Sequence, residues 1–414
     1  MDKQKISLRK TILVCLTTAV LVTFFAVAVK ALIPVFAGAD NRTPPVTTVP
    51  GDDNGKEEIS LDPNLSNEIE LAGGTAIFSS DGADGFYTVY NDGERGFALK
   101  CSNNATSFST VELSGKATLA CAYGDNVFVA VNAYGKTQVQ CVGFGDRTGY
   151  TSRSYDDQKP VFATAYDDGA AFFFTSEGES GKRLIMRFYG ENGEKVERYA
   201  ASGYDVVPTD LYRIGDSFKL FLSYSSEFSS GGGYADFSLS AITAKITLIE
   251  RKHGYTLYSA VPRQGSYALL CGSADGNFIM QLGLNLERNK KIDLDARAAD
   301  GGRLCFDGKT YYALLYSSEG GRLFTLSDES ADEKVFTYKD ATGVFGEINT
   351  GARLVHLLSG DNGFFLTSTE GLFTKTVREA DAKPVGLVKI SGTRAAVCNR
   401  IRDGKSKVYA CVFN

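Results

Sequence analysis

The chain has 414 residues, with 44 Lys and Arg against 49 Asp and Glu, and a formal net charge of -5. Residues 1–39 contain five basic residues and one acidic residue, which leaves 39 basic and 48 acidic residues, a net charge of -9, for the remainder. Such an acidic surface argues against nucleic-acid binding and against docking onto anionic lipid. The 44 Gly, 27 Phe and 21 Tyr, with only 9 Pro and no amphipathic helical period beyond residue 40, favour an all-β fold.

The N-terminal segment is predicted to be a membrane anchor. Residues 1–10 form a basic head, and residues 11–29 are nineteen consecutive uncharged, mostly apolar residues. As a helix this run would cover roughly 28 Å, close to the hydrocarbon thickness of a bilayer. The positive-inside rule keeps the head cytoplasmic and places the rest of the chain outside. The competing interpretation is a signal peptide cleaved near Ala39, because Ala37-Gly38-Ala39 has the small-x-small form of a cleavage site. Both interpretations export the remainder of the chain.

Residues 40–57 are predicted to be a flexible tether. This segment has no apolar face to bury and contains three prolines, Pro44, Pro45 and Pro50. Both properties favour an extended conformation without secondary structure. The tether would separate the anchor from the domain formed by residues 58–414.

From residue 58 onward, one pattern occurs eight times: an apolar run, a tight polar turn, a second and strongly apolar run, another Gly-containing turn, and a third strand-like run. From Gly85 to Gly392 the repeat covers 307 residues in seven steps, close to 44 residues per step. Asp-Gly and Asn-Gly pairs supply the positive φ that short hairpins require. The predicted first turns are Asp84-Gly85, Asp125-Asn126, Asp168-Gly169, Gly215-Asp216, Gln264-Gly265, Asp307-Gly308, Asp361-Asn362 and Ser391-Gly392.

This repeat resembles the β-propeller architecture, whose four-stranded units recur at such a period. The resemblance covers roughly residues 58–414 and implies an all-β propeller of eight blades. Seven blades is the alternative, because the last step, from Gly363 to Gly392, is only 29 residues. The most apolar runs, such as Val127 to Val131 and Phe218 to Leu222, do not alternate, as expected for strands covered on both faces. A fourth, more polar run follows most units, as at Phe108 to Leu113 and Lys195 to Ala200.

The last unit ends at Cys411-Val412-Phe413 and lacks a fourth strand. Glu58 to Leu61 precedes the first inner strand, which is predicted at Thr75 to Ser79. We expect Glu58 to Leu61 to supply the missing strand and to close the ring. Closure removes the exposed sheet edges that an open ring would leave.

Seven cysteines follow the anchor: Cys101, Cys121, Cys141, Cys271, Cys305, Cys398 and Cys411. No Cys-x-x-Cys pair is present and the two histidines are His253 and His356, so a zinc site is poorly supplied. Most of the cysteines are expected to be buried core thiols. Cys398 and Cys411 lie symmetrically about the Asp403-Gly404 turn and are predicted to face each other, as a candidate disulfide in an exported domain.

We assign no catalytic, cofactor-binding or metal-binding residue from the sequence. His253 and His356 are interpreted as structural, because no nucleophile and orienting partner lie near them in sequence. The loop Asp81 to Gly85 offers too few carboxylates for calcium. Most aspartates lie in turns, where the carboxylate caps its own backbone; the candidates considered are Asp156, Asp157, Asp167, Asp168, Asp205, Asp210, Asp293, Asp295 and Asp361.

The sequence therefore favours a membrane-anchored, extracytoplasmic β-propeller that acts as a binding or scaffold module of the cell envelope. Its expected partner is an envelope protein or a glycan, with no cofactor. The alternative is an envelope hydrolase, directed at glycan or peptide, with its site in the central funnel. Converging carboxylates with an arginine in the loops before the inner strands, around residues 156–159, 204–210 and 295–302, would favour the enzyme. A flat aromatic patch on the surface of the central funnel would favour protein binding.

Overall fold

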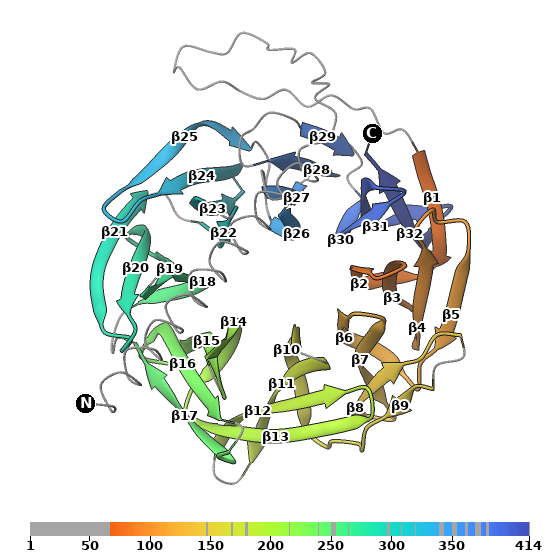
Figure 1. The fold of residues 1–414 in the computed structure, drawn as a ribbon, viewed down its shortest axis with the longest axis horizontal. Helices are drawn as coiled ribbons and strands as arrows, with labels where there is room; N and C mark the ends of the chain where they lie inside the picture. The colour runs from red at the N-terminus through yellow and green to blue at the C-terminus, as the bar shows by residue number, and fades with distance from the viewer. Residues whose placement is uncertain are drawn as a thin grey trace, which may run out of the picture. The chain divides into compact units, whose positions relative to one another are not determined.

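In the computed structural model every regular element of the described residues is a β-strand. These strands form six four-stranded sheets and one eight-stranded sheet, arranged in a ring about a central opening (Figure 1). The all-β prediction is thus confirmed for this part of the chain. The structure describes residues 67–413 apart from 146–147, 167–168, 179–180, 215, 239, 250–253, 264, 296–298, 308, 319, 339–342, 350–353, 361–362, 369–373 and 378–380.

Five of the four-stranded sheets are antiparallel meanders whose first strand lies nearest the ring centre (Figure 1). The first two contain β2 (Thr75–Gly82), β3 (Gly85–Asp92), β4 (Arg95–Ser102) and β5 (Phe108–Glu112), then β6 (Lys116–Tyr123), β7 (Asn126–Ala133), β8 (Lys136–Val142) and β9 (Tyr150–Thr151). Three later ones contain β18 (Tyr255–Arg263), β19 (Ser266–Ser273), β20 (Gly276–Gly283) and β21 (Arg288–Asp295), then β22 (Gly301–Phe306), β23 (Tyr311–Ser317), β24 (Gly320–Leu326) and β25 (Ala331–Tyr338), then β26 (Gly343–Asn349), β27 (Leu354–Gly360), β28 (Gly363–Ser368) and β29 (Thr374–Val377).

The eight-stranded sheet consists of two meanders joined at their outer strands. Its strands are β10 (Gln158–Tyr166), β11 (Gly169–Gly178), β12 (Gly181–Gly190) and β13 (Gly193–Ser202), then β14 (Asp205–Ile214), β15 (Ser217–Ser225), β16 (Ser230–Ser238) and β17 (Thr243–Leu248). The outer strands β13 and β17 pair in parallel, with Tyr199 opposite Thr243. Each of these two strands therefore covers part of an edge that would otherwise be exposed.

The last sheet closes the ring with both ends of the described chain. It contains β30 (Lys383–Ile390), β31 (Thr393–Arg402), β32 (Lys405–Val412) and, as its outer strand, β1 (Asn67–Gly73). Closure by an N-terminal strand is as expected, but the strand was assigned wrongly. Glu58 to Leu61 lies outside the described residues, and β1 is the segment that pairs with β32.

Strand β1 alternates acidic and apolar residues, which suits an outer strand whose two faces have different surroundings. Ile69 and Leu71 pack into the core shared with the meander β2–β5. On its other face Glu68 lies 2.5 Å from the guanidinium of Arg400, and Glu70 lies 2.9 Å from Lys407. This Glu-Ile-Glu-Leu alternation is the sequence signal that identifies the closing strand.

The second strands are covered on both faces, as their unbroken apolar sequences predict. In β3, Phe86 and Tyr90 belong to the core shared with the last meander, whereas Tyr87 and Val89 belong to the core shared with β6–β9. Alternate side chains of one strand therefore pack against both neighbours. This explains why such strands lack a hydrophobic alternation.

Seven of the eight predicted first turns lie between the first and second strands of their meanders. The exception is Asp361-Asn362, because the flanking strands β27 and β28 are the second and third of their sheet. The link between the first and second strands of that meander, β26 and β27, spans residues 350–353, which lie outside the described residues. With Gly351 as the reference, the last two steps become 43 and 41 residues, from Gly308 to Gly351 and from Gly351 to Gly392. The irregular spacing thus came from this misassignment.

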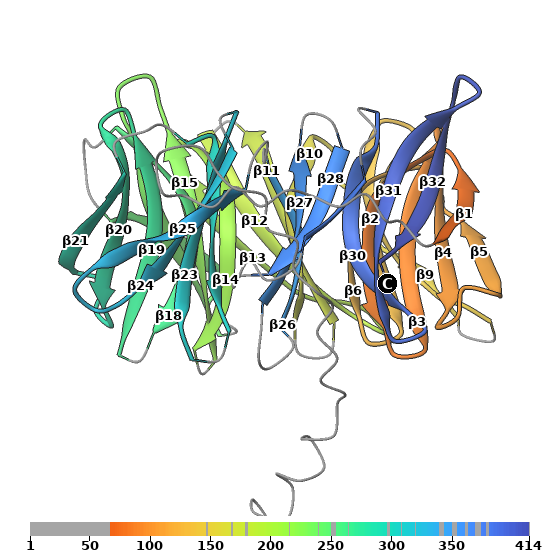
Figure 2. The same ribbon diagram turned by 90° about the horizontal axis from the view of Figure 1, so that it is seen from above.

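The two faces of the ring carry different turns. Turns between second and third strands lie on one face, here called the upper face, which is at the top of Figure 2. Turns between first and second strands lie on the opposite, lower face. Asn67 lies opposite Val412, at the end of β32, so β1 begins on the lower face.

Among the described residues, no helix is long and apolar enough to cross a bilayer. The predicted anchor, residues 11–29, and the predicted tether lie outside the described residues.

Candidate functional site

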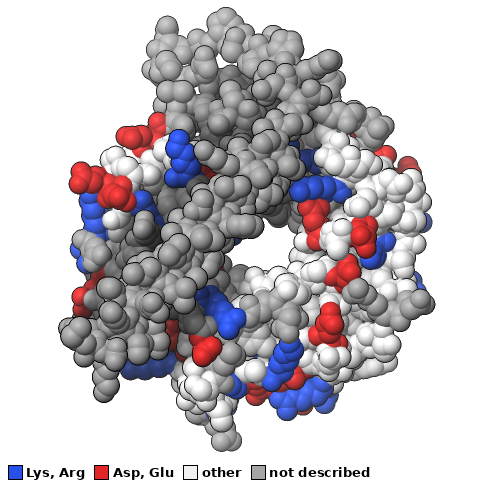
Figure 3. Space-filling model, in the orientation of Figure 1, with Lys and Arg blue, Asp and Glu red and all other residues white. Residues whose placement is uncertain are grey.

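The central opening of the ring is bordered by the innermost strands of all sheets (Figure 1). The space-filling view shows this opening with both acidic and basic side chains at its margin (Figure 3). The charge there is therefore mixed rather than of one sign.

Asp210 on β14 and Arg303 on β22 form an ion pair that spans three neighbouring innermost strands. The Arg303 Nη1 lies 3.3 Å from Asp210 Oδ1, and Asp210 Oδ2 accepts a 2.7 Å hydrogen bond from the backbone N–H of Ala260 on β18. A bulge between Pro208 and Asp210 breaks the regular pairing of β14 just before the aspartate. Such bulges redirect a side chain out of the regular alternation.

Asp210 is buried, whereas the side chain of Arg303 is 45% exposed. Burial raises the pKa of the Asp210 carboxyl, although Arg303 and the N–H of Ala260 oppose this shift. A buried carboxyl group with a raised pKa beside an arginine is a recognised mark of functional sites, and it also occurs in structural ion pairs. Arg303 was not singled out from the sequence. Its signal is a charged residue inside the otherwise uncharged strand Gly301–Phe306.

The other candidate aspartates do not converge on Asp210 in the described contacts. Asp156 and Asp205 instead each pair with a lysine. Asp156 lies 3.1 Å from Lys136, and Asp205 lies 2.5 Å from Lys182. Asp167, Asp168, Asp361 and the side chain of Asp295 lie outside the described residues. Asp81 accepts a 2.7 Å hydrogen bond from the backbone N–H of Lys389, which ties the first meander to the last. Among the described residues there is no cluster of three or more His, Cys, Asp or Glu side chains that could hold a metal ion.

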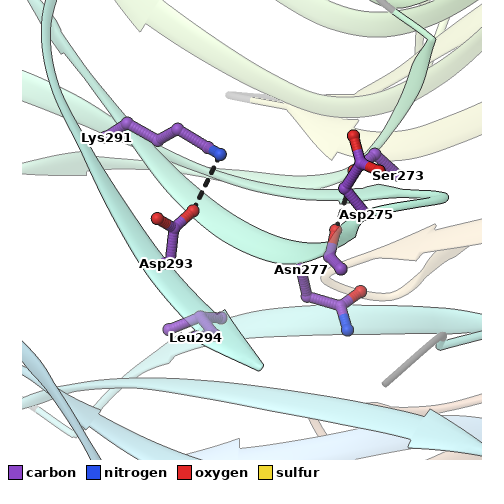
Figure 4. A pocket seen from close by; sticks show the side chains of 7 residues that line it. Ser273, Asp275, Asn277, Lys291, Asp293 and Leu294 are labelled. Carbon is purple, nitrogen blue, oxygen red and sulfur yellow. Dashed lines mark hydrogen bonds and ion pairs between the residues drawn. The ribbon is translucent and has the colours of Figure 1, made fainter. Parts of the chain in front are cut away.

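Asp293 lines a polar pocket of about 250 Å³ at the β19–β20 turn (Figure 4). The Lys291 Nζ lies 2.7 Å from Asp293 Oδ1, and both side chains are well exposed. Exposed ion pairs of this kind contribute little energy. The remaining lining residues are Ser273, Asp275, Gly276, Asn277 and Leu294.

His356 is fully buried in β27, as its apolar sequence neighbourhood predicts. Neither ring nitrogen has a hydrogen-bond partner among the described residues. Burial lowers the pKa of His356 to about 4, so the ring is neutral at physiological pH. His253 lies outside the described residues.

Cys398 and Cys411 approach each other across the last hairpin, as predicted. Their Sγ atoms are 3.5 Å apart, and both side chains are fully buried. The two residues are diagonal neighbours, because Cys398 lies opposite Tyr409 and Cys411 lies opposite Ala396. The disulfide itself stays a prediction.

A second buried charge, Arg187 on β12, is satisfied inside the fold. Its Nε lies 2.8 Å from Glu197 and its Nη1 donates to Gln158 at 2.6 Å. Its guanidinium carbon lies 3.7 Å from the centre of the Tyr155 ring. Because Tyr155 follows β9, this cluster joins two neighbouring meanders and is accounted for by packing.

The upper face carries an aromatic side chain that folding does not explain. Tyr134 occupies the two-residue turn between β7 and β8, is fully exposed at 102%, and has a positive φ of 54°. Gly135 follows with a φ of 78°, so both turn residues adopt the left-handed conformation. Such turns strongly favour Asn, Asp or Gly, and a bulky side chain at positive φ is an outlier.

Two other turns of the chain have the same backbone but small polar residues at the first position. Asp403-Gly404 has φ values of 53° and 73°, and Ser391-Gly392 has 51° and 79°. The turn geometry therefore does not require an aromatic ring. A Tyr at a position typical of Asn or Asp is the signal that sequence reasoning missed.

Phe228 is a second projecting aromatic side chain on the upper face, in the β15–β16 turn, and is 88% exposed. Ser226 fixes this turn, because its N–H donates to the carbonyl of Ser229 at 2.8 Å and its Oγ accepts the N–H of Ser229 at 3.1 Å. Ser327 makes the same two contacts with Ser330, at 2.9 Å each. In that turn the central residues are Asp328 and Glu329, both polar.

No family model matches the sequence, and no curated protein sequence matches it. Among solved structures, the chain is similar to the Dos1 propeller, with 9% identity over 83% of this chain and 93% of that chain and a TM-score of 0.55. It is also similar to apo AztD from Citrobacter koseri, with 12% identity over 76% of this chain and 88% of that one and a TM-score of 0.47. A prolyl endopeptidase gives 12% identity over 80% of this chain and 55% of that one, with a TM-score of 0.47. The fold of the described residues is thus that of a β-propeller.

Proposed function

We propose that the chain is a membrane-anchored, extracytoplasmic β-propeller that binds a protein of the cell envelope through its upper face. We further propose eight blades, counting each half of the eight-stranded sheet as one blade beside the six four-stranded sheets. The corrected turn spacing, near 42 residues at the end of the chain, supports eight rather than seven.

Anchoring is supported by the basic head and by the apolar run of residues 11–29. Because β1 begins on the lower face, a tether from the membrane would join the ring there. The upper face would then remain accessible to a partner. Cleavage near Ala39, which would release the domain, is the alternative.

The observation that carries the binding proposal is Tyr134. A fully exposed aromatic ring at positive φ costs conformational energy and gains no burial within the chain. Tyr side chains are enriched at interface hot spots, where they fill pockets on the partner. A ring on a projecting turn fits a pocket better than the flat face of a sugar, so we favour a protein over a glycan. Phe228 would act as a second contact on the same face.

Photo-crosslinking in intact cells tests this proposal. A benzoylphenylalanine side chain is placed at position 134, at position 228, or at position 123, which is the matched control because Tyr123 is an exposed aromatic residue on the lower face. We expect one and the same protein to be crosslinked from positions 134 and 228 but not from 123. Absence of protein crosslinks, or equal crosslinking from 123, would contradict the proposal.

Tyr134→Asn separates binding from stability. Asn tolerates the left-handed conformation, so we expect the free energy of unfolding of this variant to exceed that of the wild type by about 0.5 to 1 kcal/mol. The same substitution should reduce the crosslinking yield from position 228. Asp403→Asn, in the matching turn, should change neither quantity. A destabilised Tyr134→Asn variant would indicate that the ring serves the fold.

A hydrolase directed at glycan or peptide is the second candidate. The observation that favours it is the buried Asp210, with its raised pKa, beside Arg303 on the innermost strands. Both Asp210 oxygens are already engaged, by Arg303 and by Ala260, which weakens this candidate. Release of sugar or peptide fragments from purified cell envelope by the wild type, and not by Asp210→Asn, would establish it.

A further inference from the structure

The last hairpin, β31–β32, carries the contact on which ring closure depends. β32 pairs with β31 on one edge and with β1 on the other. Cys411 lies opposite Ala396 on β31 and opposite Glu68 on β1, so it sits at the centre of this three-stranded region. A covalent bond between β31 and β32 therefore also holds in place the edge of β32 with which β1 pairs to close the ring.

The two thiols in this hairpin are already in van der Waals contact. Their Sγ atoms are 3.5 Å apart, and a disulfide bond requires about 2.05 Å. The remaining distance of about 1.5 Å is small compared with the reach of a side-chain rotation and a slight shift of the strands. Both side chains point to the same side of the hairpin, where they join the core shared with β27 and β28.

We propose that Cys398 and Cys411 are joined by a disulfide in the exported protein, and that this bond locks the hairpin on which β1 closes the ring. The two thiols lose two protons and two electrons, and one S–S bond forms. The electrons pass to a disulfide oxidant, either an exchange protein or glutathione disulfide, through a mixed disulfide with one of the cysteines. The inference rests on the proposed export of the chain, because such bonds persist in oxidising compartments.

The burial of the pair also determines when the bond can form. Both side chains are fully buried, so an oxidant cannot reach them once β31 and β32 pack against the neighbouring sheet. Oxidation must therefore precede this packing step. A chain that folds while reduced would keep two inaccessible thiols.

The test uses the full chain, isolated from its native membranes in detergent and denatured in the presence of an alkylating reagent. We expect peptide mapping to recover Cys398 and Cys411 as one linked peptide, two hydrogen atoms lighter than the reduced pair. Alkyl label on both cysteines would overturn the proposal. A bond that forms during refolding with glutathione disulfide, but is absent from cells, would also overturn the proposal. That result would show that the assumption of export to an oxidising compartment is wrong.

The locking effect is measured by equilibrium unfolding with and without reductant. For the wild type we expect reduction to raise the unfolding equilibrium constant on the order of 100-fold, as for other short disulfide loops. The double variant Cys398→Ala/Cys411→Ala should not respond to the reductant. The matched control, Cys121→Ala/Cys141→Ala, removes two other buried thiols and should respond as the wild type does. An equal response of both double variants would contradict the assignment. Crosslinking from position 134 does not use these cysteines, so failure of the disulfide can be distinguished from failure of partner binding.

Discussion

The side-chain amide of Asn399 pairs with both backbone groups of Ala76, although the two residues are 323 positions apart. Its Oδ1 accepts the N–H of Ala76 at 2.7 Å, and its Nδ2 donates to the carbonyl of Ala76 at 2.8 Å. Asn91 makes the same pair of contacts with Ala117, at 2.8 Å and 2.9 Å. At the junction between the first and last sheets, and again at the next junction, a side-chain amide therefore makes the pair of hydrogen bonds that a neighbouring strand would otherwise make.

Asn399→Leu should destabilise the domain by about 2 kcal/mol, because the buried backbone groups of Ala76 lose their partner. Urea unfolding at equilibrium measures this change. Asn91→Leu is the matched control at an internal junction and should lower the free energy of unfolding by a similar amount. A silent Asn399→Leu together with a damaging Asn91→Leu would show that the first and last sheets are not joined in solution.

Removal of the closing strand should weaken the whole ring rather than one end. A chain that begins at Thr75 lacks Ile69 and Leu71 and leaves the buried Arg400 without Glu68. We expect a loss on the order of 3 kcal/mol or more, from the lost apolar burial and from the lost ion pair between Glu68 and Arg400. A chain that begins at Asn67 serves as the control and should keep its stability. Hydrogen exchange that accelerated only in β32 would contradict a cooperative ring.

His356 should make the domain less stable in mild acid. Its pKa is lowered from 6.5 to about 4 by burial, so the unfolded chain binds the proton more tightly than the folded chain. The stability is complete above about pH 6.5 and falls by on the order of 3 kcal/mol as the pH decreases to about 4.

The difference between the wild type and His356→Leu isolates this effect from other titrating groups. We expect the wild type to lose stability relative to the variant between pH 6.5 and pH 4, as measured by urea unfolding at each pH. A difference that stays constant over this range would show that the imidazole is accessible to protons in the folded state.

Asp210 should act with the opposite sign. Burial raises the pKa of this carboxyl group, so its contribution to stability is present at low pH and is lost as the pH rises through the folded-state pKa. Asp210→Asn keeps an oxygen for the N–H of Ala260 and removes the titration. The variant should therefore gain stability relative to the wild type as the pH rises.

Local signals in the sequence determined most of the strand pattern. Pairs such as Asp403-Gly404 favour positive φ wherever they occur, and an apolar run between two such turns must be a strand with both faces covered. The same signals failed at Asp361-Asn362. A turn sequence indicates that the chain reverses direction, but it does not indicate which two strands of the sheet the turn connects. The link between the first and second strands of that sheet, residues 350–353, has a weaker turn signal in its sequence and was missed for that reason.

Only the tertiary structure decided which distant residues meet. Glu58 to Leu61 and the segment Asn67–Gly73 both have a strand-like sequence, and the pairing of the latter with β32 follows from ring closure, a long-range event. Asp210 and Arg303 are 93 residues apart and come together because three innermost strands lie side by side at the ring centre. Turn preferences and hydrophobic patterning act over a few residues, so the sequence determined the strands and their turns, whereas the curvature of the closed ring determined these contacts.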